Sequence, residues 1–172
     1  MATTKQQPAL ELVEFARQGR EMGERKGHMA QAFAEAEQAA ARGEVPIGAV
    51  IVDGMSSRVL AACGNCVIEN RDPTAHAEML AIRAAARALD SERLAGCDLY
   101  VTLEPCAMCA QAIALARIRR LYFAAPDAKG GGVEHGARVF DQPTCNHRPE
   151  IYGGIDEARA AALLKDFFAG KR

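Results

Sequence analysis

The chain has 172 residues, a length that suits one domain with a hydrophobic core of its own. Its formal net charge is −1, so bulk electrostatics does not indicate a nucleic-acid-binding protein, and such a role must rest on local features. The sequence shows no signal-peptide pattern and no long apolar span, which predicts a cytoplasmic protein that does not enter a membrane. We expect its six cysteines to be thiols or metal ligands, because disulfides are rare in the cytosol.

Residues 1–27 form a predicted N-terminal extension that is rich in Gln, Glu, Arg and Lys. The few apolar residues between positions 10 and 15 predict at most a turn or two of weakly amphipathic helix. Two interpretations stay open, a flexible extension or residues that precede a start at Met29. In both, the folded domain is predicted to span residues 28–172.

Runs of helix-forming and β-branched residues define the elements of that domain. The Ala-rich run 29–42 favours a helix that ends at Gly43, and Asp53-Gly54 between two β-branched runs indicates a hairpin. In chain order the predicted elements are helix 29–42, strand 47–52, strand 58–62, helix 74–89, strand 98–102, helix 106–116, strand 120–124, a Gly-rich loop at 129–136 and helix 156–168. This order predicts an α/β fold, a three-layer α/β/α arrangement with a mixed central sheet.

Two short segments carry residues suited to metal chemistry, His76-Ala77-Glu78 and Pro105-Cys106-Ala107-Met108-Cys109. His76, Cys106 and Cys109 supply three N and S ligands, a set typical of a catalytic zinc site whose open position holds water. Zinc lowers the pKa of that water toward neutrality, and the Glu78 carboxylate is placed to carry its proton. The spacing is the H-x-E…P-C-x-x-C pattern of zinc-dependent nucleobase deaminases.

Both segments are predicted to lie in the first turn of a helix, where partial positive charge and free N–H groups favour thiolate over thiol. Two such helices lying side by side on the sheet would bring their first turns to one metal ion. The helix at 106–116 is also apolar nearly all round, so the sheet covers one side and a partner subunit is expected to cover the other. This pattern predicts a homodimer.

A second pair, Cys63 and Cys66, keeps a structural alternative open. Two Cys-x-x-Cys pairs can form a closed, all-cysteine zinc site. Against it, the gap between the two pairs is about twice that of a zinc ribbon, and Cys63 and Cys66 are predicted at a strand end with no helix beginning there. Packing, loop or surface positions are expected for the remaining cysteines and histidines, namely Cys97, Cys145, His28, His135 and His147.

From about Met29 to Arg172 the sequence resembles the tRNA-specific adenosine deaminase family of the cytidine/deoxycytidylate deaminase superfamily. The segments that carry the resemblance are EVPIGAV at 44–50, DPTAHAE at 72–78, LYVTLEPCAMC at 99–109, DAK at 127–129, NHR at 146–148 and LLKDFF at 163–168. The HAE and PCxxC segments are shared across the superfamily, whereas VTLEPCAMC followed by DAK and NHR is more specific to the tRNA enzymes.

The resemblance implies a cytidine-deaminase-like fold and a homodimer with one zinc ion per subunit, each site being lined partly by the partner subunit. It implies zinc-dependent hydrolytic deamination of adenosine to inosine at the wobble position of tRNA, in the anticodon stem-loop of an arginine tRNA. His76, Cys106 and Cys109 would hold the zinc ion, with Glu78 as the catalytic proton shuttle. The implied substrate-binding residues are Val45, Asn65, Asp127, Lys129, Asn146 and Arg148.

The chain departs from the family pattern in two places. The basic C-terminal tail is reduced to Lys171 and Arg172, and the loop at 130–135 places the acidic Glu134 beside the expected RNA surface. Two rival functions therefore stay open. One is a deaminase of a free nucleobase or nucleoside, such as cytosine or guanine, and the other is a zinc-stabilised binding module without catalysis.

Overall fold

A five-stranded sheet forms the centre of the structure, a computed structural model that describes residues 7–170. The strands are β1 (Gly48–Asp53), β2 (Val59–Gly64), β3 (Cys97–Leu103), β4 (Arg120–Ala125) and β5 (Glu150–Tyr152), in the spatial order β2-β1-β3-β4-β5. β1 is antiparallel to both β2 and β3, whereas β3, β4 and β5 run parallel. The predicted mixed sheet is confirmed. β5 was not predicted, because a strand of three residues carries no readable alternation.

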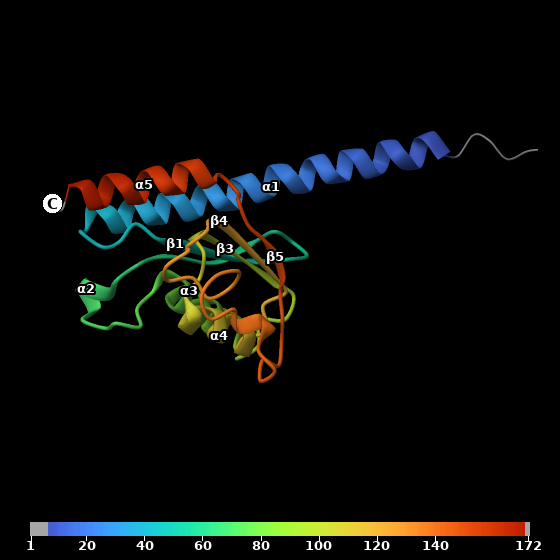
Figure 1. The fold of residues 1–172 in the computed structure, drawn as a ribbon. Helices are drawn as coiled ribbons and strands as arrows, with labels where there is room; N and C mark the ends of the chain where they lie inside the picture. Colours follow the sequence, from blue (N-terminus) through green and yellow to red (C-terminus); the bar gives the residue numbers. More distant parts are fainter. Residues whose placement is uncertain (1–6, 171–172) are drawn as a thin grey trace, which may run out of the picture.

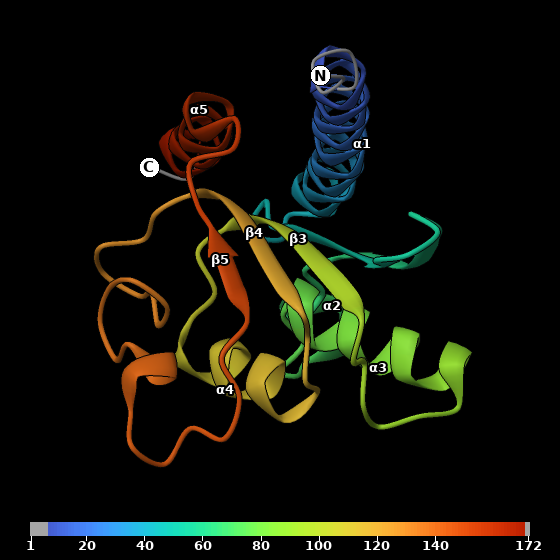
Figure 2. The same cartoon turned by 90° about the vertical axis from the view of Figure 1, so that its right-hand side faces the viewer.

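Helices cover both faces of the sheet and make three layers, as Figure 2 shows. α1 (Gln7–Ala41) and α5 (Glu157–Ala169) lie on one face, and α3 (Ala77–Leu89) and α4 (Ala107–Leu115) lie on the other (Figure 1). The short helix α2 (Val67–Asn70) and the 3-10 turn η1 (Val139–Asp141) lie in connections. The α/β/α prediction is confirmed.

α1 is much longer than the helix predicted at 29–42, because it begins at Gln7. Its first turns project past the sheet (Figure 1). Gln, Glu, Arg and Lys are good helix formers, and extending a helix that is already anchored costs far less than nucleating one. The expectation of at most a turn or two of helix before position 28 is therefore wrong. Residues 1–6 of the predicted extension lie outside the described part of the chain.

Alternate strand residues pack against the two helical layers. The cluster on the side of α3 and α4 includes Ile51, Leu99, Val101, Leu121 and Phe123. The cluster on the side of α1 and α5 includes Met29, Phe33, Val50, Tyr100 and Tyr122. β3 and β4 are buried on both faces, so their sequences are mostly apolar, as in residues 99–101 and 121–125, and do not alternate with exposed polar residues.

α1 contacts the sheet backbone to backbone. Gly48 of β1 pairs in register with Gly64 of β2. A Cβ on Gly48 would collide with the carbonyl oxygen of Ala32, and one on Gly64 would lie 2.6 Å from the carbonyl oxygen of Glu35. Glycine is therefore required at both positions. The close approach holds α1 against the first residue of β1 and the last residue of β2.

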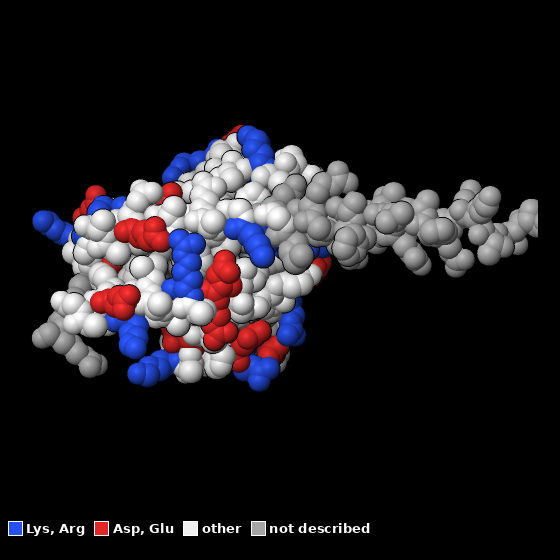
Figure 3. Space-filling model, turned by 90° about the horizontal axis from the view of Figure 1, so that it is seen from above, with Lys and Arg blue, Asp and Glu red and all other residues white. Residues whose placement is uncertain are grey.

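The surface over α1 and α5 carries Lys and Arg side chains interspersed with Asp and Glu, as Figure 3 shows from above. This mixture agrees with a net charge near zero and gives this face no broad patch of one sign in its coloured part. Within residues 7–170, no helix combines the length and apolarity needed to cross a membrane.

Candidate metal centre

The end of β3 and the starts of α3 and α4 meet on the helical face opposite α1. His76 is the N-cap residue of α3, and Cys106 is the N-cap residue of α4. The helix predicted from position 74 begins later because Asp72 forms a turn of its own, in which its Oδ1 accepts hydrogen bonds from the backbone N–H and the hydroxyl of Thr74 at 2.8 and 2.7 Å. The two helix starts are thus brought together, as the sequence predicted.

Three ligand atoms converge at this junction. The Sγ atoms of Cys106 and Cys109 lie 3.6 and 3.5 Å from Nδ1 of His76, and the three ligand atoms all lie within 4.8 Å of one another. With usual Zn–N and Zn–S bond lengths, tetrahedral ligation separates N and S by about 3.5 Å. The donor set and its spacing therefore fit a zinc ion. Among the residues whose side chains the structure describes (23 and 25–170), no other group of three His, Cys, Asp or Glu side chains brings its ligand atoms this close together.

The two cysteines have unequal acidities. The Cys109 thiol, hydrogen bonded to the Cys106 sulfur, lowers the pKa of Cys106 to about 4, and His76 contributes in the same direction. The same hydrogen bond, together with burial, raises the pKa of Cys109. The pair thus holds one thiolate and one proton between two sulfurs. A divalent cation at this point would favour the thiolate form of both.

Glu78 lies in the first turn of α3, two residues past His76, and only 4% of it is exposed. Burial raises the pKa of its carboxyl, an effect that the neighbouring His76 partly offsets. Its Oε2 atom has no hydrogen-bond partner among the described residues. An unpartnered buried oxygen costs about 1–3 kcal/mol of stability, so its presence indicates a group held ready for a proton or a ligand.

Asn65 follows β2 and belongs to the same site. Its Oδ1 accepts a hydrogen bond of 2.9 Å from the N–H of Ala77, the residue after His76, and its own N–H donates to Ile47 at 3.0 Å. Because Oδ1 is held by α3, Nδ2 is the atom with which Asn65 can donate to a bound base. Val45, half-buried, lies in the same short segment between α1 and β1 as Ile47.

The loop that follows β4 borders the metal ligands. Cys106 pairs with Gly131 in an isolated antiparallel bridge. Asp127, half-buried, accepts hydrogen bonds from the backbone N–H groups of Lys129 and Gly130 at 3.0 and 2.9 Å, while the Lys129 side chain is exposed. The structure therefore brings Asp127 and Lys129 next to the predicted zinc site.

Asn146 and Arg148 are not brought to the metal ligands. The carbonyl of Asn146 accepts a hydrogen bond of 2.6 Å from Arg117, which follows the far end of α4 from Cys106. Arg148 forms an ion pair of 2.9 Å with Asp141 of η1. Their contact with RNA stays a prediction. The shortened basic tail, Lys171 and Arg172, lies outside the described residues.

Cys63 and Cys66 stay outside the ligand group, so the all-cysteine alternative gains no support from the structure. Cys63 lies half-buried in β2, and burial raises the pKa of its thiol. Cys66 is the N-cap residue of α2, and its Sγ lies 3.6 Å from Nη2 of Arg42. The prediction that no helix begins at this pair is therefore wrong for Cys66, because a helix of one turn shows no period in the sequence.

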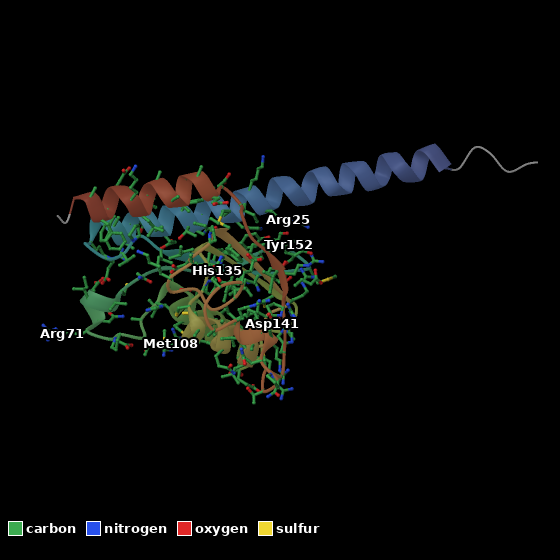
Figure 4. All side chains as sticks on the ribbon, viewed as in Figure 1. Arg25, Arg71, Met108, His135, Asp141 and Tyr152 are labelled. Atoms are coloured by element: carbon green, nitrogen blue, oxygen red, sulfur yellow. The ribbon has the colours of Figure 1, made fainter. Side chains whose placement is uncertain are left out.

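Two buried carboxylates with structural contacts were not identified from sequence. Oε1 of Glu44 accepts the N–H groups of Ile68 and Glu69 at 2.8 and 2.9 Å and so starts α2. Oε2 of Glu104 lies 2.7 Å from Nδ1 of the half-buried His135, which is labelled in Figure 4. The acidic residue between the apolar β3 and Pro105 is the sequence signal that could have indicated a buried role.

Among the other histidines and cysteines, the expectation for His28 needs a correction, whereas His147 lies in a loop, as expected. His28 lies half-buried inside α1, where its ring is 5.2 Å from the ring of Tyr100, because the helix continues through it. Nε2 of His147 lies 2.6 Å from the carbonyl oxygen of Ile118, so this histidine joins a loop to the start of β4. Cys97 is buried in the core, as expected.

The family model described as the cytidine and deoxycytidylate deaminase zinc-binding region matches residues 22–125. The matched range contains His76, Glu78, Cys106 and Cys109, and it covers more than half of the chain. The chain is therefore a deaminase with zinc as its cofactor. This is the class of enzyme that the fold and the site define.

Within that class the chain belongs to the tRNA-specific adenosine deaminase family. It is 56% identical over 151 residues to the tRNA-specific adenosine deaminase of Agrobacterium fabrum, a match that covers 88% of this chain and 98% of the relative. It is 48% identical over 138 residues to that of Aquifex aeolicus, covering 80% of this chain and 89% of the relative.

Solved structures agree with this assignment. A chain from a biochemical and structural study of A-to-I editing by tRNA:A34 deaminases at the wobble position is 56% identical, with a TM-score of 0.78 and coverage of 80% of this chain and 99% of that one. A guanine deaminase from Bacillus subtilis is 30% identical, with a TM-score of 0.58 and coverage of 84% and 92%. The superfamily fold therefore also serves an enzyme named for another base.

Proposed function

We propose that this chain converts adenosine to inosine at the wobble position of a tRNA, in the anticodon stem-loop of an arginine tRNA. One observation carries the proposal, the buried Glu78 carboxyl, whose Oε2 atom has no hydrogen-bond partner among the described residues, beside three converging ligands. The identity of 56% to a tRNA-specific adenosine deaminase selects the tRNA substrate over a free base. Because tRNA is the proposed substrate, we expect the enzyme to act in the cytoplasm.

His76, Cys106 and Cys109 would hold a zinc ion, which when bound would supply at its open position a water molecule whose pKa is close to neutrality. Glu78 would take one proton from that water and deliver it to the ring nitrogen beside the carbon that bears the amine, while the hydroxide oxygen forms a bond to that carbon. Glu78 would then carry the remaining proton of that oxygen to the amine as the carbon–nitrogen bond breaks, so the products are inosine and ammonia. Burial makes the Glu78 carboxylate a stronger base than an exposed one, which suits both transfers.

Substrate recognition is proposed for the residues that surround this centre. The Nδ2 group of Asn65 would donate to the flipped base, and Val45 would line its apolar side. The loop that carries Asp127 and Lys129 would contact the neighbouring nucleotides. Splayed bases in a loop are read by stacking and by hydrogen bonds to their edges, which requires no high net charge. Asn146 and Arg148 would contact the RNA beyond the target nucleotide.

A homodimer is proposed from the exposed face of α4. Ala107, Gln111 and Leu115, spaced four residues apart, are exposed, and Leu115 is 65% exposed. The partly buried Met108 lies on the same helix (Figure 4). A second copy would cover this exposed face, on which Ala107 and Leu115 are apolar, and complete each site. Light scattering at micromolar concentration is expected to give the mass of two chains, and the mass of one chain would contradict the proposal.

The substrate test compares an arginine anticodon stem-loop that has adenosine at the wobble position with free adenosine, cytosine and guanine. We expect inosine in the stem-loop by nucleoside mass spectrometry and very poor turnover of the free compounds, which lack the flanking contacts. The same stem-loop with guanosine at the wobble position is the matched control. Turnover of a free base without conversion of the RNA would move the chain to the small-molecule deaminases.

A further inference from the structure

We propose that Glu104 is a positioning residue of this enzyme, whose carboxylate fixes the loop of residues 127–135 against the metal ligands. The proposal rests on the proposed function, because this loop carries Asp127 and Lys129, the residues expected to contact the RNA beside the target base. Glu104 precedes Cys106 by two residues, and the hydrogen bonds of its carboxylate go to residues of this loop.

The carboxylate gathers five donors from both ends of the loop. Oε2 accepts the N–H of Asp127 at 2.9 Å and lies 2.7 Å from Nδ1 of His135. Oε1 accepts the backbone N–H groups of Val133, Glu134 and His135 at 3.2, 2.9 and 2.9 Å. The Glu104 side chain is fully buried. Burial alone would raise its pKa, but these donors hold it below the usual value. A carboxylate has about four acceptor positions, so this one is saturated.

The middle of the loop is held by close packing. The N–H of Gly132 donates to the carbonyl of Pro105 at 2.8 Å. A Cβ on Gly131 would lie 2.6 Å from the carboxyl carbon of Glu104, and one on Gly132 would lie 2.5 Å from the nitrogen of Ala107. The glycines therefore allow the loop to lie directly on the start of α4, while Glu104 supplies the charge that holds it there.

Hydrogen bonds connect Glu104 to Asp127 and Lys129, the residues proposed to contact the RNA. Glu104 holds the N–H of Asp127, and the Asp127 carboxylate in turn holds the N–H groups of Lys129 and Gly130. Cys106 touches the loop through its bridge with Gly131, but Glu104 makes no hydrogen bond to a zinc ligand, and His76 and Cys106 are placed by the starts of α3 and α4. Loss of the Glu104 charge should therefore disturb substrate binding more than chemistry.

The test is Glu104→Gln in the zinc-loaded protein. The amide presents N–H groups to donors that need an acceptor, so at least one charge-assisted hydrogen bond is lost. We expect KM for the stem-loop to rise roughly tenfold or more, with kcat changed by less than about threefold and the zinc content unchanged. Amide hydrogen exchange of residues 127–136 should accelerate by a similar factor. Glu104→Asp, which keeps the charge, should recover part of both effects.

Glu134→Gln is the matched control, because Glu134 is an exposed carboxylate in the same loop and its backbone bond to Glu104 is kept. It should leave loop exchange unchanged. His135→Ala removes a single donor and is expected to raise KM by a few-fold, which tests the proposal should Glu104→Gln not fold. Unchanged exchange in both variants, or a loss of kcat and zinc without a rise in KM, would overturn it. The exchange measurement needs no turnover, so it separates this proposal from the substrate assignment.

Discussion

Replacing Glu78 by glutamine is the most direct test of the proton shuttle, because the amide keeps the shape of the side chain but cannot carry a proton. Removal of a general acid–base group typically costs between about a hundredfold and ten-thousandfold in rate. At roughly 1.36 kcal/mol per factor of ten, this raises the activation barrier by about 2.7 to 5.4 kcal/mol. We expect the upper half of this range, because Glu78 is only 4% exposed and bulk water cannot take over its role.

The same structure predicts that the fold and the metal survive. Oε2 of Glu78 has no partner among the described residues, so its replacement breaks no hydrogen bond at that atom. The free energy of unfolding should change by less than about 1 kcal/mol, a Tm shift under about 4 °C in a chain of this size. Zinc content, Tm and the kcat for the stem-loop are measured together, with Glu92→Gln at an exposed site as control. A folded, zinc-loaded Glu78→Gln protein with near-normal kcat would refute the shuttle.

Three further outcomes are expected. The double variant Cys63→Ser/Cys66→Ser should retain one zinc ion per chain by metal analysis, and loss of the metal would favour the all-cysteine site. Gly48→Ala should lower the free energy of unfolding by about 3 kcal/mol and Tm by roughly 6–12 °C, because its Cβ meets the helix backbone; an unchanged denaturation midpoint would contradict this packing. A truncated chain that starts at Met29, which is fully buried, should fold and bind zinc. If this truncated protein is insoluble, the folded domain includes residues before Met29.

The zinc ligands were predictable because their chemistry is local in sequence. His76 and Glu78 are two residues apart, Cys106 and Cys109 are three apart, and each pair lies where a helix starts. The joining of the two pairs followed from the expected parallel placement of two helices on one sheet. The H-x-E…P-C-x-x-C spacing indicated the ligands, and the periodicity of the two helices placed that spacing near their starts.

The wall of the site that faces the substrate was not predictable in the same way. The bonds of Glu104 join it to residues 23 to 31 positions away in an irregular loop, and no period marks such contacts. Likewise, only the folded chain shows that Arg148 pairs with Asp141 rather than lying beside Cys106. Long-range polar contacts between loops depend on the tertiary structure, which local propensity does not encode.

Gly48 and Gly64, which pack beneath α1, show that the two parts of the site are held by different helical layers. Gly48 and Gly64 tie the helix to the strand ends that lead to Val45 and Asn65, whereas the zinc ligands begin helices of the opposite layer. Sequence drift in α1 would therefore shift Val45 and Asn65, the residues proposed to hold the target base, before it changed the metal ligands. A deaminase built this way can diverge toward a new base while its hydrolytic centre stays the same.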